Sequence, residues 1–436
     1  MAYWFHRNPL KATSPVTFEL AGVSTNEATR KIFSDLRLNR NKLLELLTDP
    51  NHDKASVEKV SCDYFALLIG LIKPFEEGEN KLRRAVKEEQ DVFFELANMA
   101  INLALWYTKH SAKFAAQDEV NMEEAKNVHK CLRTAGGIFN YVKNELVPQL
   151  SSMDSSGDTS AIDTDSRMLD AYINQCTAEA QEVTLARAIE LKHSPGLIAA
   201  LANETGQLFR RADDALASLD AKLVGKWRKY FQLKSDFYIA HAHCYNAESL
   251  LAQDKCGEAI RGLQEGISSY DKSAVICKDY SSTKGPGTQA KPLNHIFFRR
   301  LGPVMKRTLD KCERENGLIY HQKVAYDPPI LELKATYGLV SPEDYKPPEL
   351  SPLWSLEVYK KMDAKMAPKP GPQLPGEKEE KPKDLPPVKE KEFPMSDKDP
   401  KNSSGCVLFN VTFYISMREL SSINLLKDTF CQIGFH

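Results

Sequence analysis

A seven-residue repeat of large apolar side chains constrains this chain more than any other feature. Tyr230, Phe237, Cys244 and Leu251 follow one another at intervals of seven, and Trp227 precedes the first of them by three. Seven residues make nearly two turns of an α-helix, so these side chains lie along one helix face. The repeat predicts a long helix with a buried stripe.

Comparable stripes continue through residues 1–340. Ser194 and Pro195 have the pattern of an N-cap followed by proline in the first turn, and Asp254 is predicted to cap a later helix. Another stripe with three- and four-residue spacing consists of Leu169, Ile173, Cys176, Ala180 and Val183. Successive amphipathic helices with short turns predict a mainly all-α chain folded as an antiparallel helical array. No period of about 34 residues repeats, so a regular repeat protein is not favoured.

Composition excludes several classes of function. The 436 residues carry a formal net charge of −1, so the chain as a whole does not attract nucleic acid, and no nucleic-acid partner is expected. No apolar run reaches the ~18 residues of a membrane-spanning helix. The nine cysteines are odd in number and lack paired spacing, which indicates reduced thiols.

Candidate chemistry is sparse. His241 and His243 lie two positions apart and would point to different sides of a helix, which favours packing over metal binding. The Lys284-Gly285-Pro286-Gly287 turn lacks the spacing of a phosphate-binding loop. In the run 226–230, Trp227 and Tyr230 are expected to face the core, and Arg228 and Lys229 to face solvent. We therefore predict no catalytic residues, no metal and no cofactor.

Several segments resemble BRO domains, the helical module of Alix-like proteins. Ala178–Val183 followed by Ala199–Asn203 is similar to the central helical hairpin of that module. The other segments that carry the resemblance are Trp4–Lys11, Ala104–Lys109, Ala186–His193, Asp254–Arg261, Lys284–Gly287 and Glu332–Ala335. Together they extend from the N-terminus to about residue 345.

The resemblance implies a curved, banana-shaped, solenoid-like helical domain with a small β element near one end. It also implies a non-enzymatic adaptor in membrane remodelling, including at the nuclear envelope. The implied partners are ESCRT-III subunits (charged multivesicular body proteins), whose C-terminal amphipathic helix binds in an apolar groove. By resemblance the groove residues are Phe139, Val142, Phe209, Leu216 and Leu339. Helical spacing is equally compatible with a core position for each. The alternative is a tetratricopeptide-like scaffold that binds extended peptides.

Two departures from the family pattern concern residues 84–89 and the C-terminal end. A strand-forming insertion of the family is shortened at residues 84–89. We expect the BRO domain at 1–345, a disordered Pro/Lys/Glu-rich tail at 346–405, and an atypical extension at 406–436. Of the 24 prolines, 13 lie in residues 341–400.

A short branch of the family ends in a prenylation box, and Cys406 with the next three residues matches one only if the chain ended at Phe409. The chain instead continues to His436. We therefore expect the full-length protein to be cytoplasmic. A form ending at Phe409 would reach a membrane or the nuclear envelope through its prenyl anchor.

Overall fold

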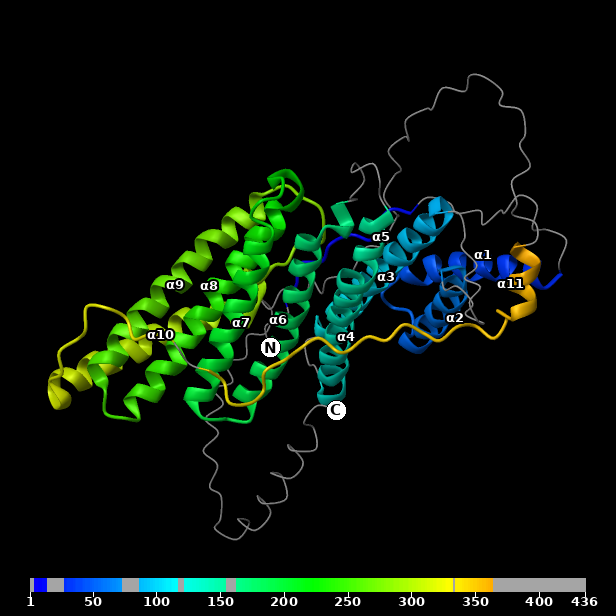
Figure 1. The fold of residues 1–436 in the computed structure, drawn as a ribbon. Coiled ribbons are helices and arrows are strands. Elements are labelled where there is room, and N and C mark those ends of the chain that lie inside the picture. The colour runs from blue at the N-terminus through cyan, green and yellow to red at the C-terminus, as the bar shows by residue number, and fades with distance from the viewer. Residues whose placement is uncertain are drawn as a thin grey trace, which may run out of the picture. The chain divides into compact units, whose positions relative to one another are not determined.

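The structure is a computed structural model that describes residues 4–13, 27–72, 86–116, 121–153, 162–331 and 334–363. These residues are almost entirely helical, which confirms the predicted all-α class. Their β structure is limited to one isolated antiparallel bridge, between Arg7 and Thr288. The α-helices of these ranges (Figure 1) are α1 Glu27–Leu47, α2 Lys54–Ile72, α3 Val86–Ala115, α4 Met122–Tyr141, α5 Val147–Met153, α6 Ser166–Glu190, α7 Pro195–Ala215, α8 Ala221–Leu251, α9 Cys256–Ser282, α10 Ile296–Glu315 and α11 Leu356–Asp363.

The chain divides into two compact units, residues 1–396 and 397–436, and every described residue lies in the first. Three predictions therefore fall wholly or partly outside the described residues. The first concerns the shortened region at 84–89, of which residues 84 and 85 are not described. The second concerns the part of the tail after residue 363, and the third the extension at 406–436, which contains Cys406.

The helices form an array in which each packs mainly against its neighbours in sequence. α6, α7, α8, α9 and α10 pack in succession, and α4 packs directly on α6, which joins this set to α1–α3 (Figure 1). The predicted stripe is confirmed, because Trp227, Tyr230 and Phe237 of α8 are all buried between α7 and α9. No described helix combines the length and apolarity needed to cross a bilayer.

Helix starts show where local sequence signals hold and where they fail. Ser194 caps α7 as predicted, since its side chain accepts a hydrogen bond from the Leu197 N–H. The predicted cap of α9 is wrong: Asp254 has φ +60° and α9 begins after Lys255. The Gln322 side chain, more than 60 residues away, instead accepts a hydrogen bond from the Gly257 N–H at 2.9 Å. A distant segment thus replaces the local cap.

The N-terminal segment, defined as residues 4–11, runs through the interior of the array. The Arg7 guanidinium lies 2.7 Å from the Glu179 carboxylate of α6, and both side chains are buried. The indole of Trp4 packs edge-on against Tyr230 and lies under the Lys234 ammonium at 3.9 Å from the ring centroid. Buried charges require partners of this kind, so the segment is fixed by specific polar contacts as well as by packing.

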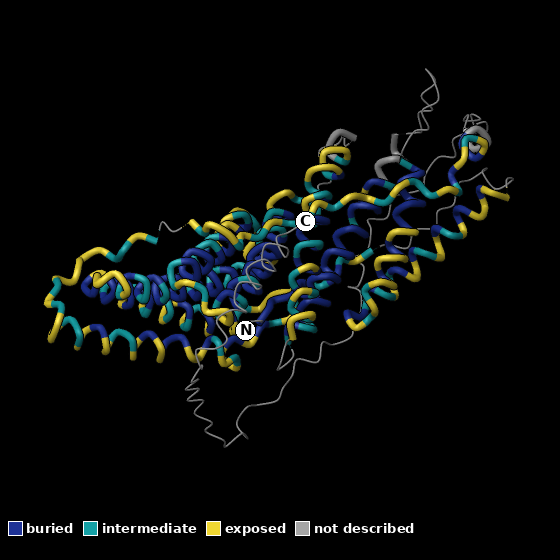
Figure 2. Tube along the Cα trace, turned by 90° about the horizontal axis from the view of Figure 1, so that it is seen from below, coloured by how far each residue is buried: buried dark blue, intermediate teal, exposed yellow. Residues whose placement is uncertain are grey.

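A second extended segment, residues 321–355, returns along the surface from α10 to α2, and we call it the return segment (Figure 1). Its backbone is bound by side chains of successive helices: Asn203 of α7 donates to the Leu331 carbonyl, Gln181 of α6 to the Gly338 carbonyl. Near α4, the Glu343 N–H donates to the Arg133 carbonyl. Most of its residues are exposed or half-buried, whereas the helices beneath are largely buried (Figure 2).

The globular domain continues beyond the predicted boundary at residue 345. The Trp354 indole N–H donates to the Leu67 carbonyl of α2 at 3.0 Å, and the Tyr359 hydroxyl donates to the Gly70 carbonyl at 2.8 Å. A Cβ on Gly70 would lie 2.1 Å from the Trp354 ring, so only glycine allows this approach. Residues 346–363, predicted as the start of a disordered tail, belong to the domain because these aromatic side chains anchor them.

Candidate partner-binding surface

Most of the predicted groove residues lie in the core. Phe139, Val142, Phe209 and Leu216 have no exposed surface, so a partner cannot contact them in this structure. The Phe139 ring stacks on Tyr172 at 4.6 Å, and the Phe209 ring packs parallel to Tyr238. The assignment of these four residues to a groove is therefore corrected. Helical periodicity marks the inward face but does not distinguish a closed core from an open groove.

Leu339 differs from the other four because it is 51% exposed. It lies on the return segment where that segment crosses α6 and α7. The Gln181 side chain donates to the Gly338 carbonyl at 2.7 Å and accepts from the Val340 N–H at 2.8 Å. This pair of bonds fixes the backbone on both sides of Leu339 and holds its side chain on the outer face.

Tyr337 is the residue that sequence reasoning missed. Residues two apart in an extended segment point to the same side, and Tyr337 is also 51% exposed. Its ring meets His193 of the α6–α7 turn edge-on at 6.1 Å. The intervening Gly338 lies against Leu201 and Thr184, and Val340 packs inward. The glycine between two large apolar residues, Tyr337 and Leu339, was the available signal.

We define the candidate surface by Tyr337, Leu339 and Leu191. Leu191 is the C-cap residue that follows α6, two residues before His193, and is also exposed. The exposed Lys192 and the half-buried Arg187 border this surface on the helical side. Arg187 is paired with the exposed Glu190 at 3.2 Å, so the border is of mixed charge. Exposed apolar side chains on a backbone that is held by hydrogen bonds suit the apolar face of an amphipathic helix.

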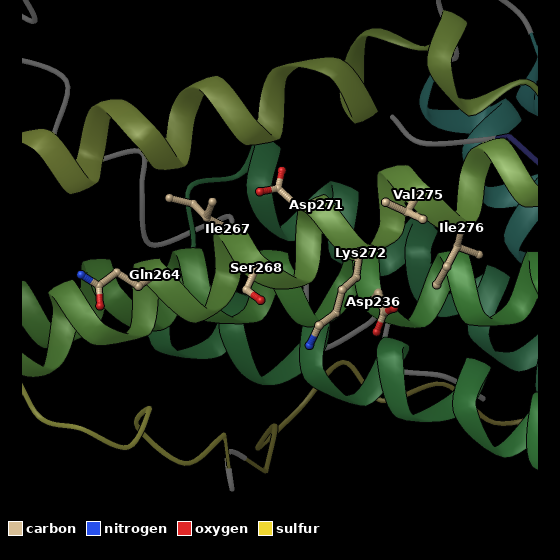
Figure 3. Close-up of a pocket in the computed structure, with 8 residues that line it drawn as sticks. All are labelled: Asp236, Gln264, Ile267, Ser268, Asp271, Lys272, Val275 and Ile276. Carbon is tan, nitrogen blue, oxygen red and sulfur yellow. The ribbon is translucent and has the colours of Figure 1, made fainter.

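A separate shallow cavity of about 700 Å³ lies on the outer side of α8 and α9 (Figure 3). Its lining combines three aliphatic side chains with polar and charged ones, and all except Asp236 of α8 come from α9. The lining residues are Asp236, Gln264, Ile267, Ser268, Asp271, Lys272, Val275 and Ile276. Burial raises the pKa of Asp236, and the nearby Lys272 and Arg210 oppose that shift. The lining has no nucleophile paired with a base, so it is a contact surface at most.

The buried ionisable groups serve packing. Lys234 and Glu182 form a fully buried pair at 2.6 Å. Burial raises the pKa of Glu182 to about 7 and lowers that of Lys234, and each partner opposes the shift of the other. His241 and His243 are buried as predicted, with His241 stacked on Phe297, and burial lowers their pKa values to about 3 and about 4. Within the described ranges, no group of three His, Cys, Asp or Glu side chains could hold a metal.

The sequence model of the BRO1-like domain family matches residues 31–362 of this chain. The chain belongs to the BRO1-like domain family. The match ends within α11 and thereby agrees with the extended boundary of the domain. Proteins of this family are adaptors. The position of the buried ionisable side chains described above, such as Lys234 and Glu182, agrees with this, because they lie in the core and not in a cleft.

Relatives and solved structures agree with this assignment. The BRO1 domain-containing protein BROX of Xenopus tropicalis is 47% identical over 384 residues, 85% of this chain and 92% of the relative. The human BROX protein gives the same identity and coverage, and the Caenorhabditis elegans BROX homolog is 40% identical over 94% of this chain and all of the relative.

Among solved structures, an ALIX BRO1–CHMP4C complex is similar with a TM-score of 0.59 and 18% identity, covering 82% of this chain and 99% of that one. A Bro1 domain described for endosomal targeting gives a TM-score of 0.52 at 19% identity, covering 77% of this chain and 88% of that one. At such identity the likeness shows the fold alone.

Proposed function

We propose that this protein is an adaptor that binds the C-terminal amphipathic helix of an ESCRT-III subunit on the surface formed by Tyr337, Leu339 and Leu191. One observation carries the proposal: Leu339 is exposed on a backbone fixed from both sides by Gln181. The similar ALIX domain was solved with CHMP4C, which supports a helix of this class as the partner. An anchor on a fixed backbone loses little conformational entropy when a partner binds.

Leu339→Asp tests this proposal. A charge in the centre of an apolar contact is expected to weaken binding of a synthetic ESCRT-III C-terminal helix by about 2 kcal/mol, roughly thirtyfold. Tyr326→Asp is the matched control, since Tyr326 is 94% exposed on the same segment but lies next to Arg261 of α9. Isothermal titration measures both. The proposal fails if the unaltered protein does not bind, and the surface is misassigned if the two variants bind equally well.

The alternative, a scaffold for extended peptides, has less support. The faces of α9, α7, α6 and α4 that such a peptide would cross are already crossed by the chain's own return segment. Its backbone uses side-chain donors, including Asn203 and Gln181, that an added peptide would need. A second extended peptide would have to displace it.

We further propose that membrane attachment through a lipid depends on the C-terminal end. A form ending at Phe409 would carry a prenylation box at Cys406, because such a box is a cysteine followed by the last three residues of a chain. In cell fractionation the shorter form is expected to associate with membranes, including the nuclear envelope, and Cys406→Ser is expected to release it. Because one prenyl chain anchors only marginally, partial association counts as support. Equal fractionation of both forms would refute this proposal.

A further inference from the structure

α10 differs from the other long helices of its layer because it packs mainly against α9 alone. Its inner side is formed by buried residues, among them Phe298, Leu301 and Met305. Gly302 allows close contact with the ring of Tyr270. In Figure 2, α10 lies at the lower left edge of the array, with exposed residues on its outer side. One complete helix face is therefore open to a partner.

The outer face of α10 has a consistent sequence. Helical positions separated by three or four residues share a face. The ridge opposite the buried side consists of Ile296, Arg300, Pro303, Arg307, Lys311 and Arg314, all of them exposed. Arg299, Lys306 and the exposed Asp310 flank it on one side and Val304 on the other, so the first part of the face is basic and Asp310 is the first acidic residue on it.

The charged residues in the first part of this face are all basic. From Ile296 to Leu309 there are four basic residues and no acidic residue. Within the described part of the chain, Arg299, Arg300, Lys306 and Arg307 form no ion pair with a carboxylate, in contrast to Lys311, which lies 3.6 Å from Glu315. The whole chain has a net charge of −1, so this concentration of positive charge is local. It matches a surface with fixed negative charge.

Apolar side chains are interspersed with these charges. Ile296 is 48% exposed and Val304 37%, and Leu293, on the turn that leads into α10, is also exposed. A solvated charged face does not require exposed aliphatic residues, and a surface for single-stranded nucleic acid uses aromatic side chains to stack on bases. Cationic and aliphatic side chains together on an outward helix face are typical of a helix that lies in a lipid headgroup region.

We propose that the outer face of α10 binds an anionic membrane surface. Arg299, Arg300, Lys306 and Arg307 contact lipid phosphates, while Ile296 and Val304 reach the boundary between headgroups and acyl chains. This interaction requires neither prenylation nor an ESCRT-III partner. It orients the domain with the α10 edge against the bilayer.

Vesicle co-sedimentation of the unlipidated full chain tests the proposal. We expect stronger binding to vesicles of phosphatidylcholine mixed with phosphatidylserine than to phosphatidylcholine alone. Each basic residue near an anionic surface contributes roughly fivefold to partitioning. Arg300→Glu with Arg307→Glu is therefore expected to lower binding by at least tenfold. Added salt is also expected to weaken it.

Lys42→Glu with Lys59→Glu is the matched control, since both lysines are exposed on α1 and α2 and the change in net charge is the same. Ile296→Ser with Val304→Ser, which leaves the charge unchanged, is expected to reduce binding less than the charge reversal does. The proposal is overturned if the unaltered protein does not prefer anionic vesicles. It is also overturned if both charge-reversed variants lose binding equally, or if duplex nucleic acid binds this face more tightly than vesicles.

Discussion

Two extended segments cross the same helical array, one attached mainly through its side chains and the other mainly through its backbone. The N-terminal segment lies inside, where Arg7 pairs with Glu179 and Trp4 lies under Lys234. The return segment lies outside and is bound mainly through backbone groups that accept or donate hydrogen bonds to helix side chains. The inner segment therefore has few free side chains, whereas the outer one can present Tyr337 and Leu339. Attachment through the backbone leaves side chains available for recognition.

The largest expected effect on stability comes from removing Lys234, which pairs with Glu182 and lies over Trp4 of the N-terminal segment. Lys234→Met leaves Glu182 as a buried carboxylate without its cation, which typically costs about 3–5 kcal/mol of unfolding free energy. Denaturant titration measures the loss. Lys229→Met is the control, because Lys229 is 3.7 Å from Asp279 at a partly exposed site and is expected to change stability by less than about 1 kcal/mol. Equal effects of the two variants would show that the buried pair has no special role.

A smaller effect is expected from lifting the outer segment off its helices. A Cβ on Gly137 of α4 would lie 1.9 Å from the Glu343 carbonyl oxygen. Gly137→Ala is therefore expected to destabilise the domain by about 1–3 kcal/mol through overpacking. Gly225→Ala in α8, whose Cβ would meet nothing closer than 3.9 Å, is expected to stabilise it by roughly 0.5–1 kcal/mol. Stabilisation by both variants would mean that the return segment is readily displaced from α4.

The smallest effect is a pH dependence that belongs to the inner segment. Burial lowers the pKa of His6 from 6.5 to about 3. A lowered folded-state pKa contributes stability that is present above pH 6.5 and is lost as pH falls from 6.5 toward 3. Between pH 7.5 and pH 5.5 the loss for one histidine is about 1.4 kcal/mol.

Denaturation at pH 7.5 and 5.5 measures this loss, and His6→Gln is expected to remove its share of the slope. The other buried histidines, including His241, would still contribute in that variant. An unchanged slope in His6→Gln would contradict the assignment.

Sequence reasoning succeeded where structure is local and periodic. The stripe of α8 and the Ser194 cap of α7 were both predicted, because helix periodicity and capping depend on residues within a few positions. The Lys234–Glu182 pair was not predicted, since the two residues lie 52 positions apart and nothing local connects them. The prediction of the α9 cap failed for the same reason, since the group that accepts from the Gly257 N–H is the distant Gln322 side chain.

The candidate surface was predicted only in part. Leu339 was identified and is exposed, but Phe139, Val142, Phe209 and Leu216 are core residues. An apolar residue on a helix has the same pattern whether its face is covered by another helix or by a partner. The domain boundary was misplaced because the prolines near residue 350 suggested a tail, although Trp354 and Tyr359 are the large aromatic residues that a docked segment needs.

The attachment of Trp354 and Tyr359 to α2 has a mechanical consequence. Tension applied to the chain beyond Asp363 enters the domain at α11 and is transmitted first to α2 through the bonds to Leu67 and Gly70. While those bonds hold, α2 carries part of the load, and the return segment is not peeled from the helices. A pull on the far end of the chain therefore has to break these two contacts before it can lift Leu339 off α6.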